Sequence, residues 1–395
     1  MRVYADNAAT TAMSPAAKAA MLPYLDEIFG NPSSPHSFGQ AAAEALEQAR
    51  ECVASCLNAA AREIYFTSGG SEADNQAIRS AALDGAKKGR KHIISSKFEH
   101  HAVLHTLKKL EQEGFEVQLL DVYDNGMVRV EDVKAAIRPD TALVTIMFAN
   151  NEIGTVQPIR EIGAACRSAG VPFHTDAVQA AGHLAIDVQT MNIDLLSLSG
   201  HKFHGPKGVG ALYVRRGSVP LTSLIEGGAQ ERGKRAGTEN LPGIVGMAAA
   251  LREACERMEE DQKKVSAMRD QLIEGLKKIP MARLNGDRTH RLPGNVNFSF
   301  PGIEGEGMLL LLDSMGIAAS SGSACTSGSL DPSHVLLAIG LPHEIAHGSL
   351  RLSLSEENTM EECDYVVDSL KEIVKRLRDM SPLYEEAVKS GEIPG

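Results

Sequence analysis

Two neighbouring glycines followed by a serine could bind a phosphate group. The strand-like run EIYFTS leads into Gly69, Gly70 and Ser71 and then into a run of helical period. Glycine lets a ligand approach the backbone closely, and the free amides and dipole of a helix start attract an anion such as phosphate. We therefore expect Gly70 and Ser71 to bind phosphate, although an ordinary S-x-x-D capping box has the same pattern.

Two charged residues follow other strand-like runs. Asp176 ends the run VPFHTD, and Lys202 comes shortly after the run DLLSLSG. A carboxylate at the end of a buried strand needs a cationic partner, and a lysine there is either a solvated loop cation or a residue that forms a Schiff base. A phosphate site, an acid for a pyridinium nitrogen and a lysine for an aldehyde together describe pyridoxal 5′-phosphate (PLP). His100, after the run KHIISS, can lie over the ring of this cofactor or belong to a surface pair with His101.

One cysteine has unusual surroundings. Cys325 lies in the run SSGSACTSGS, whose other residues are all small or polar. This composition is typical of an exposed loop, where a reactive thiol is more plausible than a buried structural one, so we expect a chemical role for Cys325. The remaining cysteines are scattered along the chain and are expected to be reduced thiols: Cys52, Cys56, Cys166, Cys255 and Cys363.

The pentapeptide HEIAH at 343–347 matches the zinc motif H-E-x-x-H. Pro342 and Gly348 bracket it and leave room for about one helical turn. No third ligand follows at a customary spacing, so we favour a short surface helix over a metal site. A zinc hydrolase that uses HEIAH is the rival interpretation, and we expect no structural metal.

The elements that position these residues alternate between strand-like and helix-like runs. Seven apolar runs indicate an α/β fold with a mainly parallel seven-stranded sheet flanked by helices, whose ligand sites lie at the carboxyl ends of the strands. An amphipathic helix over 247–278 leads into a smaller α+β domain with strands NVNFSF and SLRLSL and a helix over 360–380. We place the large domain at 16–258 and the small domain at 1–15 together with 259–395.

The composition is that of an ordinary globular protein. The chain has 395 residues, 43% of them hydrophobic, and a net charge of −11, which makes broad nucleic-acid binding unfavourable. The opening MRVYADNAATT lacks the basic and apolar parts of a signal peptide, and no stretch reaches the roughly 20 apolar residues of a membrane span. We therefore expect a cytoplasmic protein without membrane contact.

Eight motifs in their family order resemble the cysteine desulfurases of the NifS/IscS type, which belong to the class V aminotransferase group of PLP enzymes. They extend over essentially the whole chain: YADNAATT, GNPSSPHSFG, FTSGGSEADN, ANNEIGTVQPI, HTDAVQAAG, SGHKFHGPKGVG, RAGTEN and SSGSACTSGS. The resemblance implies a fold-type I PLP-transferase, conversion of L-cysteine to L-alanine, and sulfur carried as a persulfide on Cys325. It also implies a homodimer and a sulfur acceptor, such as an iron–sulfur scaffold protein, so that Cys325 could transiently ligate a cluster.

The same resemblance implies roles for individual residues. Lys202 would bind the cofactor covalently, Asp176 would pair with the pyridine nitrogen, and His100 would stack on the ring and relay protons. The remaining expected contacts are Asn151 and Gln179 to the ring hydroxyl side, Gly70, Ser71, Ser199 and His201 to the phosphate with Thr238 from a second subunit, and Arg351, with Asn151, to the substrate.

Other functions remain open at this point. An aminotransferase, a different β-elimination enzyme or a selenocysteine lyase would use the same cofactor, and an aminotransferase would not need Cys325. A silent docking scaffold is the alternative without chemistry, and intact Lys202, Asp176 and Cys325 argue against it. The acceptor of the sulfur depends on partner surfaces that the motifs do not specify.

Overall fold

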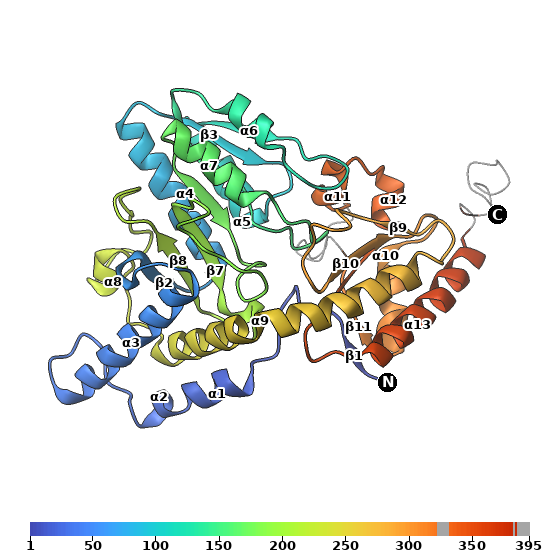
Figure 1. Ribbon diagram of the computed structural model, residues 1–395, viewed down its shortest axis with the longest axis horizontal. Coiled ribbons are helices and arrows are strands. Elements are labelled where there is room, and N and C mark those ends of the chain that lie inside the picture. The colour runs from blue at the N-terminus through green and yellow to red at the C-terminus, as the bar shows by residue number, and fades with distance from the viewer. Residues whose placement is uncertain (322–331, 382–383, 385–395) are drawn as a thin grey trace.

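A seven-stranded sheet forms the centre of the larger lobe of the molecule (Figure 1). The computed structural model describes residues 1–321, 332–381 and 384. The strand order is β2-β8-β7-β6-β5-β3-β4, and only β8 runs antiparallel to its neighbours, which confirms the predicted mainly parallel sheet. Its strands are β2 (Ile64–Thr67), β3 (His92–Ser96), β4 (Glu116–Leu120), β5 (Thr141–Thr145), β6 (Phe173–Asp176), β7 (Leu195–Ser199) and β8 (Gly210–Val214).

Helices cover both faces of this sheet. Consecutive strand residues point to opposite faces, so that Ile93 and Leu143 contribute to one apolar cluster while Ile94 and Val144 contribute to the other. This explains why several of the strands show no clean alternation of apolar and polar residues. One face carries α4 (Gly70–Lys87) and α5 (His101–Gln112), and the other carries α3 (Ser37–Cys56), α6 (Val130–Ala136), α7 (Ile159–Ala169) and the first half of α9 (Leu241–Leu276).

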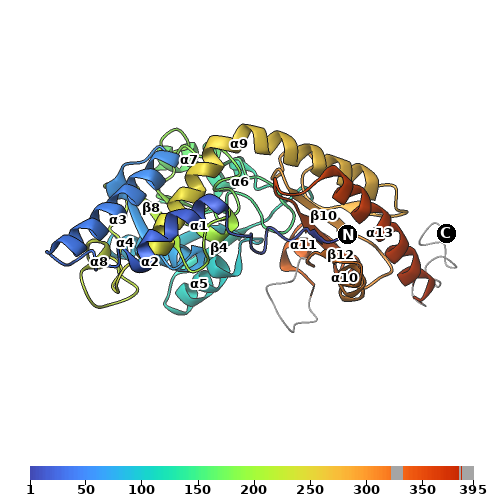
Figure 2. The same ribbon diagram turned by 90° about the horizontal axis from the view of Figure 1, so that it is seen from below.

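The long helix α9 joins the two lobes, as both views show (Figures 1 and 2). It begins at Leu241, after the N-cap Asn240, and so starts earlier than the predicted helix over 247–278. Its second half packs against the smaller lobe, where residues such as Val265 and Leu272 join an apolar cluster of their own. The short helices α1 (Pro15–Met21) and α2 (Pro23–Asp26) lie along its first half, and α8 (Gln230–Gly233) precedes it in the chain.

The smaller lobe is built on an antiparallel sheet of order β12-β10-β9. Its two longer strands, β10 (Asn295–Ser299) and β12 (Ser349–Ser353), and its last helix, α13 (Met360–Asp379), confirm the sequence predictions. The two-residue strands were not predicted, because two residues carry no periodicity. The remaining elements are β1 (Val3–Tyr4), which pairs with β11 (Ile317–Ala318), β9 (Arg283–Leu284), α10 (Gly305–Ser314), α11 (His334–Ala338) and α12 (His343–His347).

The apolar clusters divide the chain near the predicted domain limits but not along them everywhere. Val335, Leu336 and Ala346, from α11 and α12, belong to the core of the larger lobe although they lie far along the sequence. The limits 16–258 and 1–15 with 259–395 therefore stay a prediction. In the described part of the chain, no helix is long and apolar enough to cross a membrane.

Candidate active site

Lys202 lies just beyond the carboxyl end of β7, as predicted for a site residue. Its Nζ donates hydrogen bonds to two backbone carbonyls of the N-terminal segment, 2.7 Å from the oxygen of Ala8 and 2.8 Å from that of Ala9. Gln179 donates a hydrogen bond of 3.0 Å to the same Ala8 oxygen. The N-terminal segment therefore forms one wall of the site, and its role was not predicted because nothing in an Ala-Ala pair indicates chemistry.

Asp176 ends β6 next to β7 and is only 5% exposed. One of its oxygens accepts a hydrogen bond of 2.9 Å from the backbone N–H of Val178. Burial raises the pKa of this carboxyl to about 6, while the backbone hydrogen bond and the charge of Lys202 act in the opposite direction. Because burial disfavours the charged form of this carboxyl, an additional cation, such as a protonated ring nitrogen, would stabilise the carboxylate.

His100 is the N-cap of α5, and its Nδ1 accepts a hydrogen bond of 3.1 Å from the backbone N–H of Ala102. This contact assigns the ring proton of the neutral form to Nε2. Burial, and then the charge of Lys202, lowers the pKa of His100 to about 4. His100 is therefore a neutral donor near Lys202 rather than a surface histidine.

The start of α4 has open backbone amides. The helix begins at Gly70, its N-cap is Gly69, and no side chain caps it, so the alternative of an S-x-x-D capping box is wrong. A Cβ on Gly69 would lie 3.6 Å from the Oγ of Ser199, which places the end of β7 beside this helix start. A Cβ on Gly70 would lie 2.5 Å from a methyl group of Val178, so the backbone approaches the strand ends as closely as glycine allows.

Three further residues expected at the phosphate differ in their surroundings. The Nδ1 of His201 lies 3.1 Å from the Oγ1 of Thr10, and burial together with Lys202 and Lys207 lowers the pKa of His201 to about 4. Ser71 is exposed at the first turn of α4. Thr238 is exposed on the loop before α9.

Arg351 comes to the same region from the small lobe. This residue of β12 is 3% exposed, and its Nη2 forms an ion pair of 3.0 Å with Asp6. Its Nη1 donates a hydrogen bond of 3.1 Å to the backbone oxygen of Asn151, and its buried Nε has no hydrogen-bond partner among the described residues. Asp6 was missed by the sequence reasoning, although it lies in the quoted motif YADNAATT.

Cys325 lies outside the described residues, whereas both flanks of its segment lie near the site. Ser320 and Arg351 exchange backbone hydrogen bonds of 3.2 and 2.7 Å. On the other flank, the Oγ of Ser333 donates a hydrogen bond to the carboxyl of Glu152, which follows Asn151. Ser320 and Ser333, which lie on either side of the segment that contains Cys325, are therefore both next to residues of the candidate site.

Two buried carboxyls near the site were not predicted. Glu99 is fully buried before His100 and accepts hydrogen bonds from the Met147 backbone and from Ser96, while burial raises its pKa to about 8. Burial likewise raises the pKa of Glu152 to about 7. Glu99 was passed over in the motif Glu99-His100-His101 because histidine is the more familiar ring partner.

The HEIAH segment does not resemble a zinc site. It forms the five-residue helix α12, and His343, Glu344 and His347 are all exposed. In the chain up to 321, from 332 to 381 and at 384, no group of three or more His, Cys, Asp or Glu side chains is arranged to hold a metal ion. The short surface helix is the interpretation that agrees with this geometry.

The residues at the strand ends fit PLP. The uncapped start of α4 offers amides to a phosphate, the buried Asp176 favours a cationic ring nitrogen, and Lys202 supplies the amine for the aldehyde. These groups are contributed by three elements that share one edge of the sheet. The match depends on side chains and backbone groups that the fold brings together from distant parts of the sequence.

Comparisons with known proteins agree with this geometry. The model of the aminotransferase class-V family matches residues 3–366. The cysteine desulfurase IscS of Clostridium botulinum (strain Hall) is 58% identical over 394 residues, which cover 99% of each chain. The IscS cysteine desulfurase of Methanosarcina thermophila is 57% identical over 381 residues, covering 96% of this chain and 94% of its own.

The solved structures lead to the same family. A NifS-like protein superposes with a TM-score of 0.89 and 39% identity, covering 95% of this chain and 100% of its own. The protein SspA in complex with cysteine superposes with a TM-score of 0.80 and 39% identity, covering 90% and 99%. The chain therefore belongs to the class V aminotransferase family and, within it, to the IscS- and NifS-type cysteine desulfurases.

Proposed function

We propose that this protein binds PLP and converts L-cysteine to L-alanine, with the sulfur transferred to Cys325 as a persulfide. The observation that carries the proposal is the convergence of Lys202 and Arg351 on the N-terminal segment 6–9, with the buried Asp176 at the end of the strand next to β7. Asp176 and Lys202 suit the cofactor, and Arg351 suits the carboxylate of a substrate. The relatives named as cysteine desulfurases support this choice of substrate.

The cofactor contacts follow from the groups at the strand ends. When bound, PLP would supply an electron sink for bond changes at the substrate Cα. Asp176 would hold a proton on the ring nitrogen, and the amine of Lys202 would move a proton at the substrate Cα. Gly70, Ser71, Ser199 and His201 would hold the phosphate, while Asn151 and Gln179 would contact the ring hydroxyl side. His100 would cover the ring as a neutral imidazole.

Arg351 would bind the substrate carboxylate. A guanidinium suits this task because its fork donates two parallel charge-assisted hydrogen bonds. The buried Nε of Arg351 lacks a partner among the described residues, and Asp6 and the Asn151 carbonyl hold the two Nη atoms. These two contacts fix the orientation of the guanidinium before a substrate arrives.

The sulfur step needs Cys325 as a thiolate. The thiolate would attack the substrate sulfur, so that a sulfur–sulfur bond forms while the bond between sulfur and Cβ breaks. The electron pair of the broken bond stays with carbon, which takes up a proton and leaves as L-alanine. The persulfide then passes its outer sulfur to an acceptor, such as an iron–sulfur scaffold protein, or is reduced to sulfide by a thiol.

We also propose that two copies of the chain form the working enzyme in the cytoplasm. Four large apolar residues are exposed on neighbouring elements: Leu22 at 53%, Leu25 at 60%, Phe29 at 66% and Phe38 at 57%. The rings of Phe29 and Phe38 are in contact, with centroids 5.7 Å apart. An exposed apolar patch of this kind is typical of a subunit interface. A partner would then supply Thr238 to the phosphate site.

Product analysis with the Cys325→Ala variant tests the proposed reaction. With L-cysteine and a thiol reductant, the natural protein should release equal amounts of L-alanine and sulfide, and the variant should release neither while it still binds PLP. Full activity in the variant would contradict the role of Cys325 and favour a lyase acting without an enzyme thiol. Transfer of the amino group to a 2-oxo acid would instead identify an aminotransferase.

A further inference from the structure

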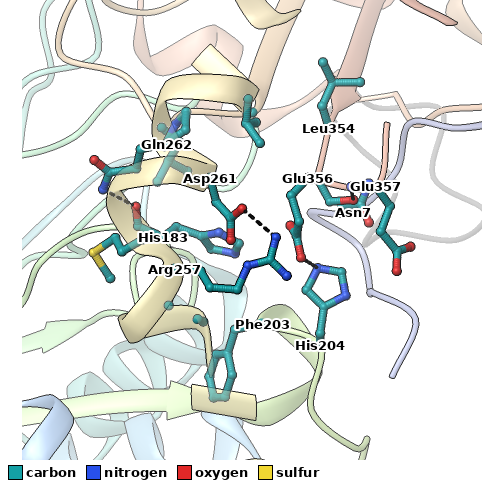
Figure 3. A pocket seen from close by; sticks show the side chains of 18 of the residues that line it. Asn7, His183, Phe203, His204, Arg257, Asp261, Gln262, Leu354, Glu356 and Glu357 are labelled. Carbon is teal, nitrogen blue, oxygen red and sulfur yellow. Dashed lines mark hydrogen bonds and ion pairs between the residues drawn. The ribbon is translucent and has the colours of Figure 1, made fainter. Parts of the chain in front are cut away.

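A cavity of about 250 Å³ lies between the two lobes, beside the turn that carries Lys202 (Figure 3). Phe203 and His204 line it from the large lobe, and Leu354, Glu356 and Glu357 line it from the chain that follows β12. The middle of α9 forms a further wall. In this cavity, the turn after Lys202 therefore faces the segment that follows β12 and Arg351.

One ion pair crosses this cavity. The Nε2 of His204 lies 3.4 Å from an oxygen of Glu356 (Figure 3). The Nδ1 of His204 lies 2.9 Å from the backbone oxygen of Ala12. Both ring nitrogens of His204 thus face oxygen atoms that only accept hydrogen bonds. The Nε2 contact meets the distance of an ion pair but does not have the geometry of a hydrogen bond, so Glu356 stabilises the positive charge of an imidazolium rather than a single N–H. The geometry favours a charged His204.

His204 is also part of a constrained turn. Its φ of +61° lies in the left-handed region, which is unfavourable for a residue with a Cβ. Its N–H donates a hydrogen bond of 2.9 Å to the Oγ1 of Thr11, and its oxygen accepts one of 2.9 Å from the N–H of Ser14. The carbonyl of Lys202 accepts a hydrogen bond of 2.9 Å from the Nε2 of His183. Movement of His204 would therefore displace the backbone of Lys202.

We propose that His204 and Glu356 are positioning residues that form an ionic latch between the lobes, holding the turn of Lys202 in register with the strand that carries Arg351. The inference rests on the proposed function, because it assumes that Lys202 and Arg351 act on one substrate. Glu356 lies a few residues after Arg351, and Phe203 alone separates His204 from Lys202 in the sequence. The ion pair therefore connects two short segments, one that carries Arg351 and one that carries Lys202.

Other charged residues lie near His204 and Glu356. On α9, Arg257 forms an ion pair of 3.2 Å with Asp261. Burial and then the charge of Glu356 raise the pKa of Asp261. Glu357 is exposed beside Glu356, and burial lowers the pKa of His183. The ammonium of Lys264, on α9, donates a hydrogen bond to the backbone oxygen of Glu356, so among the described residues His204 is the cation that contacts the Glu356 carboxyl itself.

The latch has a defined dependence on pH. Burial opposes the charge of both groups, but the contact and the electrostatic attraction between them raise the pKa of His204 and lower that of Glu356 to about 2. Because the folded pKa of His204 lies above its unfolded value, the stabilisation is fully present below the unfolded pKa. It is lost as the pH rises through the folded pKa of His204.

The variants Glu356→Gln and His204→Asn test the latch, and Glu357→Gln is the matched control. Asparagine tolerates the left-handed backbone at 204, so His204→Asn removes the charge without adding strain. We expect kcat/KM for L-cysteine to fall about tenfold in both variants, because the reacting groups lose their alignment. The pH titration of the absorbance of bound PLP should shift in both variants and stay unchanged in Glu357→Gln.

Thermal unfolding of the full chain, with and without PLP, tests the latch independently of activity. The loss of Tm caused by Glu356→Gln should be largest at about pH 6 and should shrink as the pH is raised, because His204 loses its charge as the pH passes through its raised pKa. A loss that does not depend on pH would overturn the proposal, as would an unchanged PLP titration in both variants. If the natural protein releases no L-alanine, the proposed function fails, whereas the unfolding result still decides whether the ionic pair exists.

Discussion

Two cationic residues of this site, Arg351 and Lys202, are oriented by fixed hydrogen-bond partners. Arg351 is buried and is oriented by Asp6 and by the Asn151 carbonyl before any substrate binds. Lys202 is held in the same way by two carbonyls of the N-terminal segment. Because each of these cations has fixed partners, substitutions that keep the charge but change the shape should still impair the enzyme.

The substitution Arg351→Lys tests this at the substrate carboxylate. A lysine keeps the charge but lacks the planar fork, so we expect KM for L-cysteine to rise about tenfold or more while kcat changes less. Steady-state kinetics measure both values. Arg283→Lys, at an exposed position of β9 in the same sheet, is the control and should behave like the natural protein. An unchanged KM in Arg351→Lys would mean that another group binds the carboxylate.

Elements decide which of these residues meet. The seven strands of the large sheet and the two longer strands of the small lobe were predictable, because each is an apolar run bounded by polar segments. Asp176 and Lys202 were predictable as neighbours because the carboxyl ends of β6 and β7 share one edge. The partners Asp6 and Ala8 were not, since their contacts depend on how an irregular N-terminal segment passes between the lobes.

At this scale, Gly70→Ala tests the start of α4. The added Cβ would lie 2.5 Å from Val178, so either the helix start or the loop after β6 must move. We expect the affinity for PLP to fall about tenfold, because the amides would no longer converge on the phosphate. Absorbance titration of the apo-protein with PLP measures this.

The control for this experiment is Gly307→Ala in α10. There the nearest neighbour of the new Cβ is a methyl group of Leu377 at 3.7 Å, which is ordinary contact. Alanine is also the better helix former, so this variant should bind PLP normally and unfold at an equal or higher temperature. Equal affinities in the two variants would argue against phosphate binding at α4.

The whole molecule presents an apolar patch that a single copy leaves uncovered. Leu25 and Phe29 lie at the end of the large lobe remote from α13, on and just after α2 (Figure 1). The sequence indicated a dimer only through its resemblance to a family, because the exposure of an apolar residue depends on the tertiary fold. The patch provides a physical reason that belongs to this chain.

The substitution Leu25→Asp should weaken the proposed dimer. A carboxylate in an apolar interface loses its hydration without gaining a partner, so the variant should elute as a single chain at concentrations where the natural protein is a dimer. Size-exclusion chromatography with light scattering measures this. Leu310→Asp is the control, since Leu310 is 68% exposed on α10 of the other lobe. A Leu25→Asp protein that remains dimeric would move the interface elsewhere.

The N-terminal segment links the start of the chain to groups that are synthesised much later. Val3 pairs with Ile317, Asp6 holds Arg351, and Ala8 and Ala9 hold Lys202. During translation, the first ten residues leave the ribosome long before these partners exist. The large sheet can form earlier, but the wall around Lys202 closes only when residue 351 has emerged. We therefore expect the proposed cofactor to bind late in the synthesis of the chain, and a protein truncated before β12 to lack the finished site.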